Sequence, residues 1–170
     1  MLLDFKKYIF VFTTLFLSSC RGEDESNLQK IDQVLNIYIK NAEGKDLLNT
    51  NIPGGFTAVR AQDLNADRAL QDIIGISVKK DQDTIAYVDY ATGAVRILKD
   101  SISASQKMYQ SDFYINLSKI VNKETVTDVD TVKVEYNWSP NLFQVSKVWY
   151  NNKLSFSKVE GQPNIIHIVK

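Results

Sequence analysis

The chain of 170 residues contains a single cysteine, Cys20, and a single histidine, His167. One cysteine cannot build a disulfide framework, so the stability of the domain has to come from a buried core. One histidine cannot supply the usual sets of zinc ligands. With only 3 prolines and 7 glycines in the chain, we expect fairly regular elements with few breaks.

The sequence also lacks an excess of either charge and lacks a membrane-spanning run. Its 20 Lys and Arg residues balance 20 Asp and Glu residues, and no basic cluster is present, which argues against nucleic acid as a partner. No apolar stretch reaches the about 20 residues that a spanning helix needs. No repeat or low-complexity tract divides residues 31–170, which we predict to form one domain.

The longest apolar run lies near the N-terminus, from Tyr8 to Leu17, and follows the basic pair Lys6-Lys7. Its length suits the apolar region of a secretory signal peptide, about 7–15 residues. Two serines and Cys20 come next, and Leu17-Ser18-Ser19-Cys20 resembles the lipobox of bacterial lipoproteins. The alternative is a buried first element of the domain, which is disfavoured because no apolar residue follows Cys20 until Leu28.

This resemblance implies a signal helix, residues 1–19, that is cleaved before Cys20. The sulfur of Cys20 would then carry diacylglycerol, and the new N-terminus would usually carry a further acyl chain such as palmitate. Two or three chains are needed because one chain alone binds a membrane only marginally. The expected partner is therefore a membrane, reached through the N-terminal lipid, and the expected location is the outer membrane.

Residues 20–30 form the predicted linker between lipid and domain. The acidic run Glu23-Asp24-Glu25 resembles export signals that follow the lipidated cysteine in some surface lipoproteins, which would imply the cell surface. The same residues equally indicate a solvated, flexible spacer. Fully extended, residues 21–30 would reach roughly 35 Å.

Alternation of apolar and polar residues with a period of two dominates the rest of the chain and predicts an all-β domain. Turn signals at 91–94 and 151–152 predict hairpins over 85–98 and 145–157. Residues 62–72 form either the one helix or a loop. We expect an antiparallel β-sandwich or a curled sheet. Its expected strands are 35–40, 56–60, 74–78, 85–90, 95–98, 113–117, 132–138, 145–150, 154–157 and 165–169.

Two segments within the domain carry a second resemblance. Residues 36–49 (NIYIKNAEGKDLLN) and residues 130–154 (DTVKVEYNW…VWYNNKL) resemble segments of small uncharacterised bacterial outer-membrane lipoproteins with an Ig-like or related β domain. The resemblance implies fold and location only. It implies no activity and no cofactor.

The sequence offers little support for catalysis, and the prediction is that the protein is not an enzyme. His167 lies among Ile165, Ile166, Ile168 and Val169, a setting typical of a structural histidine. A hydrolase, the third function class considered, would need carboxylates that converge on His167 or on Asp63 in a cleft.

A calcium loop is the only metal site that the residue pattern suggests. Asp63, Asn65 and Asp67 place oxygen donors at alternate positions. An EF-hand loop also needs Gly at position six and Glu at position twelve, where this chain has Arg68 and Ile74. Turn capping is the better explanation, so no metal is predicted.

Three short segments resemble a sequon for O-glycosylation of exported bacterial proteins, Asp followed by Ser or Thr and an aliphatic residue. The hydroxyl groups belong to Thr84, Ser101 and Thr131. The alternative interpretation is that Asp followed by such residues simply marks turns that lead into strands.

Aromatic residues gather near the end of the chain as Trp138, Trp149 and Tyr150. A flat, exposed row of these rings could stack sugar rings, whereas a sandwich core uses the same residue types. The first hypothesis is therefore a lipid-anchored cell-envelope domain for binding, adhesion or assembly, with an envelope protein or glycan as partner. The alternative is a glycan-binding accessory lipoprotein of an uptake system. Exposure of the three rings distinguishes these hypotheses.

Overall fold

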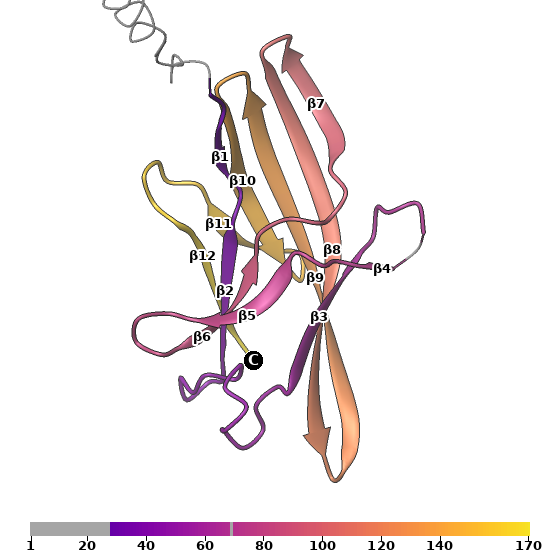
Figure 1. Cartoon of the computed structure of the whole chain (residues 1–170), viewed down its shortest axis with the longest axis vertical. Coiled ribbons are helices and arrows are strands. Elements are labelled where there is room, and N and C mark those ends of the chain that lie inside the picture. The colour runs from indigo at the N-terminus through magenta and orange to yellow at the C-terminus, as the bar shows by residue number, and fades with distance from the viewer. Residues whose placement is uncertain (1–27, 69) are drawn as a thin grey trace, which may run out of the picture.

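The computed structural model describes residues 28–68 and 70–170, and all regular structure in this part of the chain is β-strand (Figure 1). The prediction of an all-β domain is confirmed. The predicted signal peptide, Cys20 and most of the predicted linker lie outside the described residues. The described strands are β1 (Lys30–Asp32), β2 (Leu35–Lys40), β3 (Ala58–Asp63), β4 (Gln71–Asp72), β5 (Ile76–Lys80), β6 (Ala86–Tyr90), β7 (Ile97–Ser103), β8 (Gln106–Val121), β9 (Glu124–Ser139), β10 (Leu142–Tyr150), β11 (Lys153–Ser157) and β12 (Asn164–Val169).

The strands form two sheets. The large sheet has the order β1-β10-β9-β8-β3-β4, with β11 also beside β10 and β7 also beside β8; the small sheet has the order β12-β2-β6-β5. β1 runs parallel to β10, and β12 runs parallel to β2. The expectation of wholly antiparallel sheets is therefore wrong, because alternation indicates which face a residue occupies but not which strand lies beside it.

The core lies between the two sheets. Tyr90 of the small sheet stacks on Phe113 of the large sheet with ring centroids 4.6 Å apart. The predicted inward residues of β2 are fully buried: Leu35, Ile37 and Ile39. We call the side of the large sheet that faces the small sheet its inner face, and the opposite side its outer face.

The β8–β9 hairpin is the longest feature of the fold, with 16 residues in each strand. The alternation predicted only 113–117 and 132–138, because these are the parts that the small sheet and the core bury on one face. Beyond them the strands continue with half-buried or exposed residues on both faces, apart from the buried polar residues Ser111 and Asp130. At the end where β1 enters, the large sheet extends past the small sheet (Figure 1).

The predicted hairpin over 85–98 is wrong. β6 lies in the small sheet and β7 in the large sheet, so residues 91–96 cross between the sheets. Side chains hold this crossing: Asp63 Oδ2 accepts a hydrogen bond from the Val95 amide at 2.6 Å, and Ser111 Oγ donates to the Val95 carbonyl at 2.9 Å. A tight turn and a short crossing share the same turn residues, so the pattern alone does not separate them.

The second predicted hairpin is confirmed as β10 and β11, which pair antiparallel. Asn151 and Asn152 form its turn with φ of 49° and 65°, a conformation that asparagine tolerates and that suits the twist of a two-residue hairpin. The described residues of the segment 62–72, all but residue 69, are not helical. They are the end of β3, a loop and β4, so the loop alternative holds.

No helix in the described part of the chain is long and apolar enough to cross a membrane.

Candidate functional site

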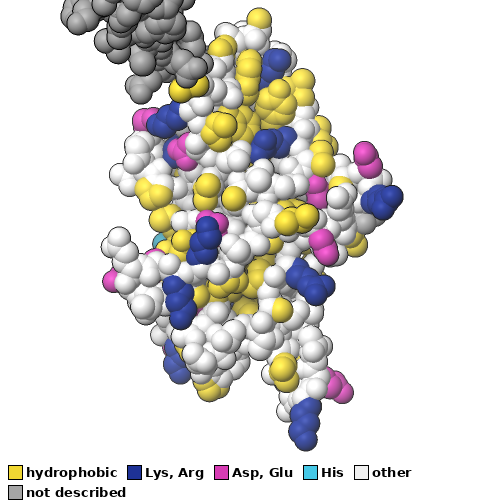
Figure 2. All heavy atoms as spheres, viewed as in Figure 1, with side chains coloured by type: hydrophobic (Ala, Val, Ile, Leu, Met, Phe, Trp, Pro, Cys, Tyr) yellow, Lys and Arg dark blue, Asp and Glu magenta, His cyan; other side chains and the backbone are white. Residues whose placement is uncertain are grey.

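The part of the inner face that extends past the small sheet carries a cluster of aromatic and cationic side chains. Figure 2 shows apolar surface gathered there around Lys and Arg side chains. We call this surface the Trp138 face and define it by its aromatic and cationic residues: Arg96, Lys107, Tyr109, Trp138 and Phe143.

Strand register places these residues together. Trp138 of β9 lies directly opposite Lys107 of β8 on one side and opposite Phe143 of β10 on the other. Tyr109 lies opposite Tyr136 in the next inward pair. Directly opposed residues in antiparallel strands project from the same face, so three strands contribute to one surface.

Both cations of the Trp138 face lie over aromatic rings. Lys107 Nζ is 5.0 Å from the centre of the Trp138 ring. Arg96 Cζ is 4.7 Å from the ring centre of Phe143 and 5.4 Å from that of Tyr136. These distances fall within the range of cation–π attraction.

Hydrogen bonds hold the guanidinium group of Arg96 in place. Its Nη2 donates to Gln33 Oε1 at 2.7 Å and to Thr92 Oγ1 at 3.2 Å. Both bonds use one of the three guanidinium nitrogens. Among the described residues, neither Arg96 nor Lys107 forms an ion pair with a carboxylate.

Two open cavities have Trp138 in their lining. The cavity on the inner face has a volume of about 270 Å³ and contains Arg96, Tyr109 and Phe143 together with the amides of Gln29 and Gln33. The other, of about 300 Å³, is lined by Asn137, Leu142 and Gln144, which alternate with the inward residues and project to the outer face. Only the first cavity belongs to the Trp138 face, and it combines one cation, apolar surface and side-chain amides, the composition of a small-molecule site.

The structure does not bring Trp138, Trp149 and Tyr150 together. Trp149 lies on the outer face, where Lys133 Nζ is 4.0 Å from its ring centre. Tyr150 points inward and is 4 % exposed. Neighbouring residues of a strand project to opposite faces, so the predicted flat row of three rings does not form. Only Trp138 remains on an open part of the inner face.

Tyr150 belongs to a buried polar cluster around Asp130. Asp130 accepts hydrogen bonds from Tyr150 Oη at 2.5 Å, Asn151 Nδ2 at 2.6 Å and Lys170 Nζ at 2.5 Å. Burial by itself would raise the pKa of Asp130, but the hydrogen bonds from Lys170, Tyr150 and Asn151 outweigh it and hold the pKa below its usual range. For Tyr150, burial and its bond to Asp130 both raise the pKa.

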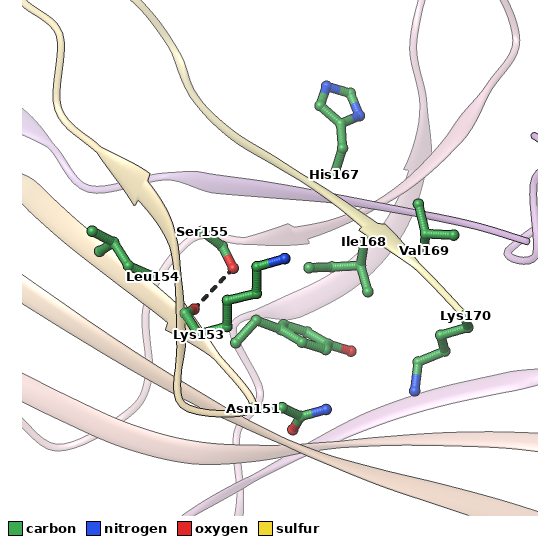
Figure 3. Close-up of a pocket in the computed structure, with 9 residues that line it drawn as sticks. Asn151, Lys153, Leu154, Ser155, His167, Ile168, Val169 and Lys170 are labelled. Carbon is green, nitrogen blue, oxygen red and sulfur yellow. Dashed lines mark hydrogen bonds between the residues drawn. The ribbon is translucent and has the colours of Figure 1, made fainter. Parts of the chain in front are cut away.

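This cluster borders a cavity of about 450 Å³ between β11 and β12 (Figure 3). Its polar groups already bind one another: Lys170 pairs with Asp128 and Asp130, and Ser155 Oγ donates to the carbonyl oxygen of Lys153 at 3.0 Å. The cavity therefore offers fewer uncommitted groups than the Trp138 face.

His167 does not form a catalytic cluster with carboxylates. It is exposed on β12 and stacks on Tyr38 with ring centroids 5.1 Å apart. Figure 3 shows its ring directed away from Lys153 and Lys170. The residues that line the cavity include no Asp or Glu.

Asp63, the first residue of the suspected calcium loop, has a structural role. Its Oδ1 accepts the Asn65 amide at 2.8 Å, and its Oδ2 accepts the Val95 amide at 2.6 Å. The described residues contain no group of three or more His, Cys, Asp or Glu side chains placed to hold a metal ion.

The three suspected O-glycosylation positions differ in their surroundings. Thr84 is exposed at the turn between β5 and β6, and Ser101 is exposed on β7. Thr131 is half-buried, and its Oγ1 donates to Asn151 Oδ1 at 3.3 Å. The aspartate before it, Asp130, is buried in the polar cluster.

No protein-family model, no curated protein and no solved structure matches this chain. The sequence analysis missed Arg96, Lys107, Tyr109 and Phe143 as members of a site. Alternation extended backward from Phe113 would have placed Tyr109 and Lys107 on the inner face, but only the β8–β9 register shows that Lys107 lies opposite Trp138.

Proposed function

We propose that the protein is a lipid-anchored, non-enzymatic binding domain of the bacterial cell envelope that serves in binding, adhesion or assembly. Lipid on Cys20 holds it in the outer membrane, and residues 1–19 are removed as the signal peptide. The Trp138 face binds the partner.

The observation that carries this proposal is the open Trp138 face. Trp138 and Tyr109 are half-buried and Arg96 is exposed, whereas Phe143 is buried with its ring under Arg96. Partly exposed apolar surface of this kind often marks a functional site. β1 pairs with residues 142–144 beside this face, so the linker leads to the same end of the fold. Residues 21–30 of the linker span at most roughly 35 Å, which keeps the face close to the envelope.

We also propose that the two facing sheets form a β-sandwich related to the Ig-like domains. Supporting this, side chains of both sheets share one core, as the stack of Tyr90 on Phe113 illustrates. The parallel pairs β1–β10 and β12–β2 make it a variant and not a standard antiparallel sandwich.

A second candidate function is a glycan-binding accessory lipoprotein of an uptake system. It is favoured by the composition of the inner-face cavity at Trp138, where the amides of Gln29 and Gln33 lie beside aromatic rings. Sugars present hydroxyl groups around an apolar ring face, and both features need such partners.

Two experiments test the proposal. The first compares cell fractions of wild type and Cys20→Ala: loss of the protein from the outer membrane supports the lipid anchor, and unchanged membrane fractionation contradicts it. The second measures sedimentation of the purified protein with isolated cell envelopes. Trp138→Ala should reduce the bound fraction and Trp149→Ala should not; equal binding of both variants would contradict the assignment of the face.

A further inference from the structure

Three polar side chains form a cluster where the loop between β11 and β12 passes beside β1 (Figure 1). They are Asp32 of β1, Lys158, which directly follows β11, and Asn164, which begins β12. Asn164 is 3 % exposed, the Lys158 side chain is 9 % exposed, and the Asp32 side chain is 29 % exposed. A lysine amine and a side-chain amide are thus held together with little access to water.

The lysine amine lies against the side-chain amide. Lys158 Nζ donates to Asn164 Oδ1 at 2.9 Å and to the carbonyl oxygen of Gln162 at 2.7 Å. Since a C=O bond measures about 1.2 Å, Nζ lies at most about 4.1 Å from the Cγ atom of Asn164. Reacting atoms need a separation of about 3–3.5 Å, so a small movement of the amine brings its nitrogen within reach of Cγ.

Asp32 connects this amine to the nitrogen of the amide. Its Oδ2 accepts a hydrogen bond from Lys158 Nζ at 2.6 Å, and its Oδ1 accepts one from Asn164 Nδ2 at 2.8 Å. The carbonyl oxygen of Val34 accepts a second hydrogen bond from Nδ2 at 2.9 Å, which fixes the orientation of the amide. One carboxylate therefore contacts both nitrogens, the position that a proton carrier between them requires.

We propose that Lys158 and Asn164 react to form an intramolecular isopeptide bond, with Asp32 as the general base and acid. A bond forms between Nζ and Cγ, the bond between Cγ and Nδ2 breaks, and Nδ2 leaves as ammonia. The step exchanges one amide for another, so it needs no oxidant, reductant or co-reactant. Each chain reacts once, and the permanent proximity of the two groups replaces an encounter between them.

The proton transfers balance within the cluster. Burial by itself would raise the pKa of Asp32, but the hydrogen bonds from Lys158 and Asn164 outweigh it and hold the pKa below its ordinary value. The ion pair is therefore the resting form, and transfer of one proton from Lys158 to Asp32 precedes attack. The neutral amine then attacks Cγ, and Asp32 gives the proton to the departing Nδ2. A second proton from Nζ passes through Asp32 to the ammonia, which leaves as ammonium.

The bond would join the two sheets. Lys158 follows a strand of the large sheet, and Asn164 begins a strand of the small sheet. β1, which carries Asp32, directly follows the predicted linker and pairs with β10. The cross-link would therefore lie where a pull on the proposed lipid anchor enters the domain.

The test is mass spectrometry of tryptic peptides from the full chain, purified from its own membranes. Trypsin cleaves after a lysine with a free amine, so the bond would leave residues 154–170 as one peptide, lighter by one ammonia than the linear sequence. We expect this peptide. Cleavage after Lys158 would overturn the proposal, including the case in which residues 159–170 have lost ammonia, because cyclisation of Asn164 onto its own backbone leaves Lys158 free.

The matching variant is Asp32→Asn, which keeps the size of the side chain and removes the proton carrier. It should lower the cross-linked fraction at least about tenfold. Asp89→Asn is the control, because Asp89 also lies 2.6 Å from a lysine amine, that of Lys79, and it should leave the fraction unchanged. An unchanged fraction in Asp32→Asn, or an equal loss in both variants, would overturn the role of Asp32. The wild-type peptide alone decides whether the bond exists, even where a variant fails to fold.

Discussion

Trp138 and Trp149 lie on opposite faces of the large sheet, each with a lysine ammonium over its ring. Lys107 Nζ is 5.0 Å from the ring centre of Trp138, and Lys133 Nζ is 4.0 Å from that of Trp149. The local chemistry of the two pairs is alike. Their surroundings differ: Trp138 has Arg96, Tyr109 and Phe143 beside it, whereas Trp149 and Lys133 line a cavity of about 370 Å³ that also contains the acidic Asp112. The second cation and the additional rings distinguish the Trp138 face from the Trp149 pair.

Thr84 occupies a turn position that normally belongs to glycine. The turns 41–45 and 81–85 share one hydrogen-bond pattern. The backbone carbonyl of the first residue accepts a hydrogen bond from the amide of the fourth residue, and the side-chain oxygen of the first residue accepts one from the amide of the fifth. The fourth residue is Gly44 in one turn, with φ of 79°, and Thr84 in the other, with φ of 64°. A β-branched residue is strained at positive φ.

We therefore expect Thr84→Gly to stabilise the protein by about 0.5–1 kcal/mol, the relief of strain exceeding the greater chain entropy of glycine. The reciprocal change Gly44→Thr should destabilise it by about 1–2 kcal/mol. No heavy atom lies within 4 Å of a Cβ built on Gly44, so the loss would reflect backbone strain alone. Urea unfolding measures the free energy of unfolding of both variants. A Thr84→Gly variant less stable than wild type would contradict the backbone strain assigned to Thr84.

The Asp130 cluster should make the free energy of unfolding depend on pH in the acidic range. The pKa of Asp130 is lowered in the folded protein, so the carboxylate stabilises the fold at pH values above its usual pKa. This contribution is lost as the pH falls through the lowered value. Between pH 5 and pH 2, the free energy of unfolding of wild type should fall more steeply than that of Asp130→Asn.

The measurement is urea unfolding at a series of pH values, with Asp128→Asn as the control. Asp128 pairs with the same Lys170 but is exposed. Asp128→Asn should therefore change the slope of the free energy of unfolding against pH less than Asp130→Asn does. Parallel curves for wild type and Asp130→Asn would contradict the role assigned to the cluster.

Glycosylation, if the sequon resemblance is correct, should follow exposure. Thr84 and Ser101 are exposed, whereas Thr131 is hydrogen-bonded and follows the buried Asp130. Peptide mass spectrometry of the protein from its own cells should find glycan on Thr84 or Ser101 and none on Thr131. Glycan on Thr131 would require β9 to separate from its neighbouring strand, and it would contradict the prediction that exposure decides which position is modified.

Alternation along a strand predicted which residues face the core, and the structure confirms it for Leu35, Ile37 and Ile39 of β2. The same rule already separates Trp149 from Tyr150, since neighbours on a strand cannot share a face. It found only the first two residues of β7, at the end of the expected strand 95–98, because all residues of β7 are exposed and show no burial pattern. It also could not place β6 and β7 in different sheets, because that depends on long-range packing.

The site was less predictable than the fold for the same reason. Trp138 was recognisable as an aromatic residue, but its neighbours Lys107 and Phe143 come from other strands, 31 positions before it and 5 after it in the chain. Arg96 lies in the segment that crosses between the sheets, where the sequence pattern predicted the second strand of a hairpin, residues 95–98. The register of β8, β9 and β10 and the segment that crosses between the sheets together create the surface. Neither can be predicted from the alternation of residues along one strand.

The central claim is that the inner face at Trp138, and not the outer face, contacts the partner. Ile97 and Leu98 test it directly, because they are adjacent on β7, equally exposed at 49 %, and on opposite faces. Leu98 lies opposite Tyr109 on the inner face, and Ile97 lies opposite Gln110 on the outer face. A photo-crosslinking amino acid at either position in living cells should leave the fold intact. We predict an envelope adduct from position 98 that Arg96→Gln abolishes, and none from position 97; an adduct from position 97 alone would contradict the account.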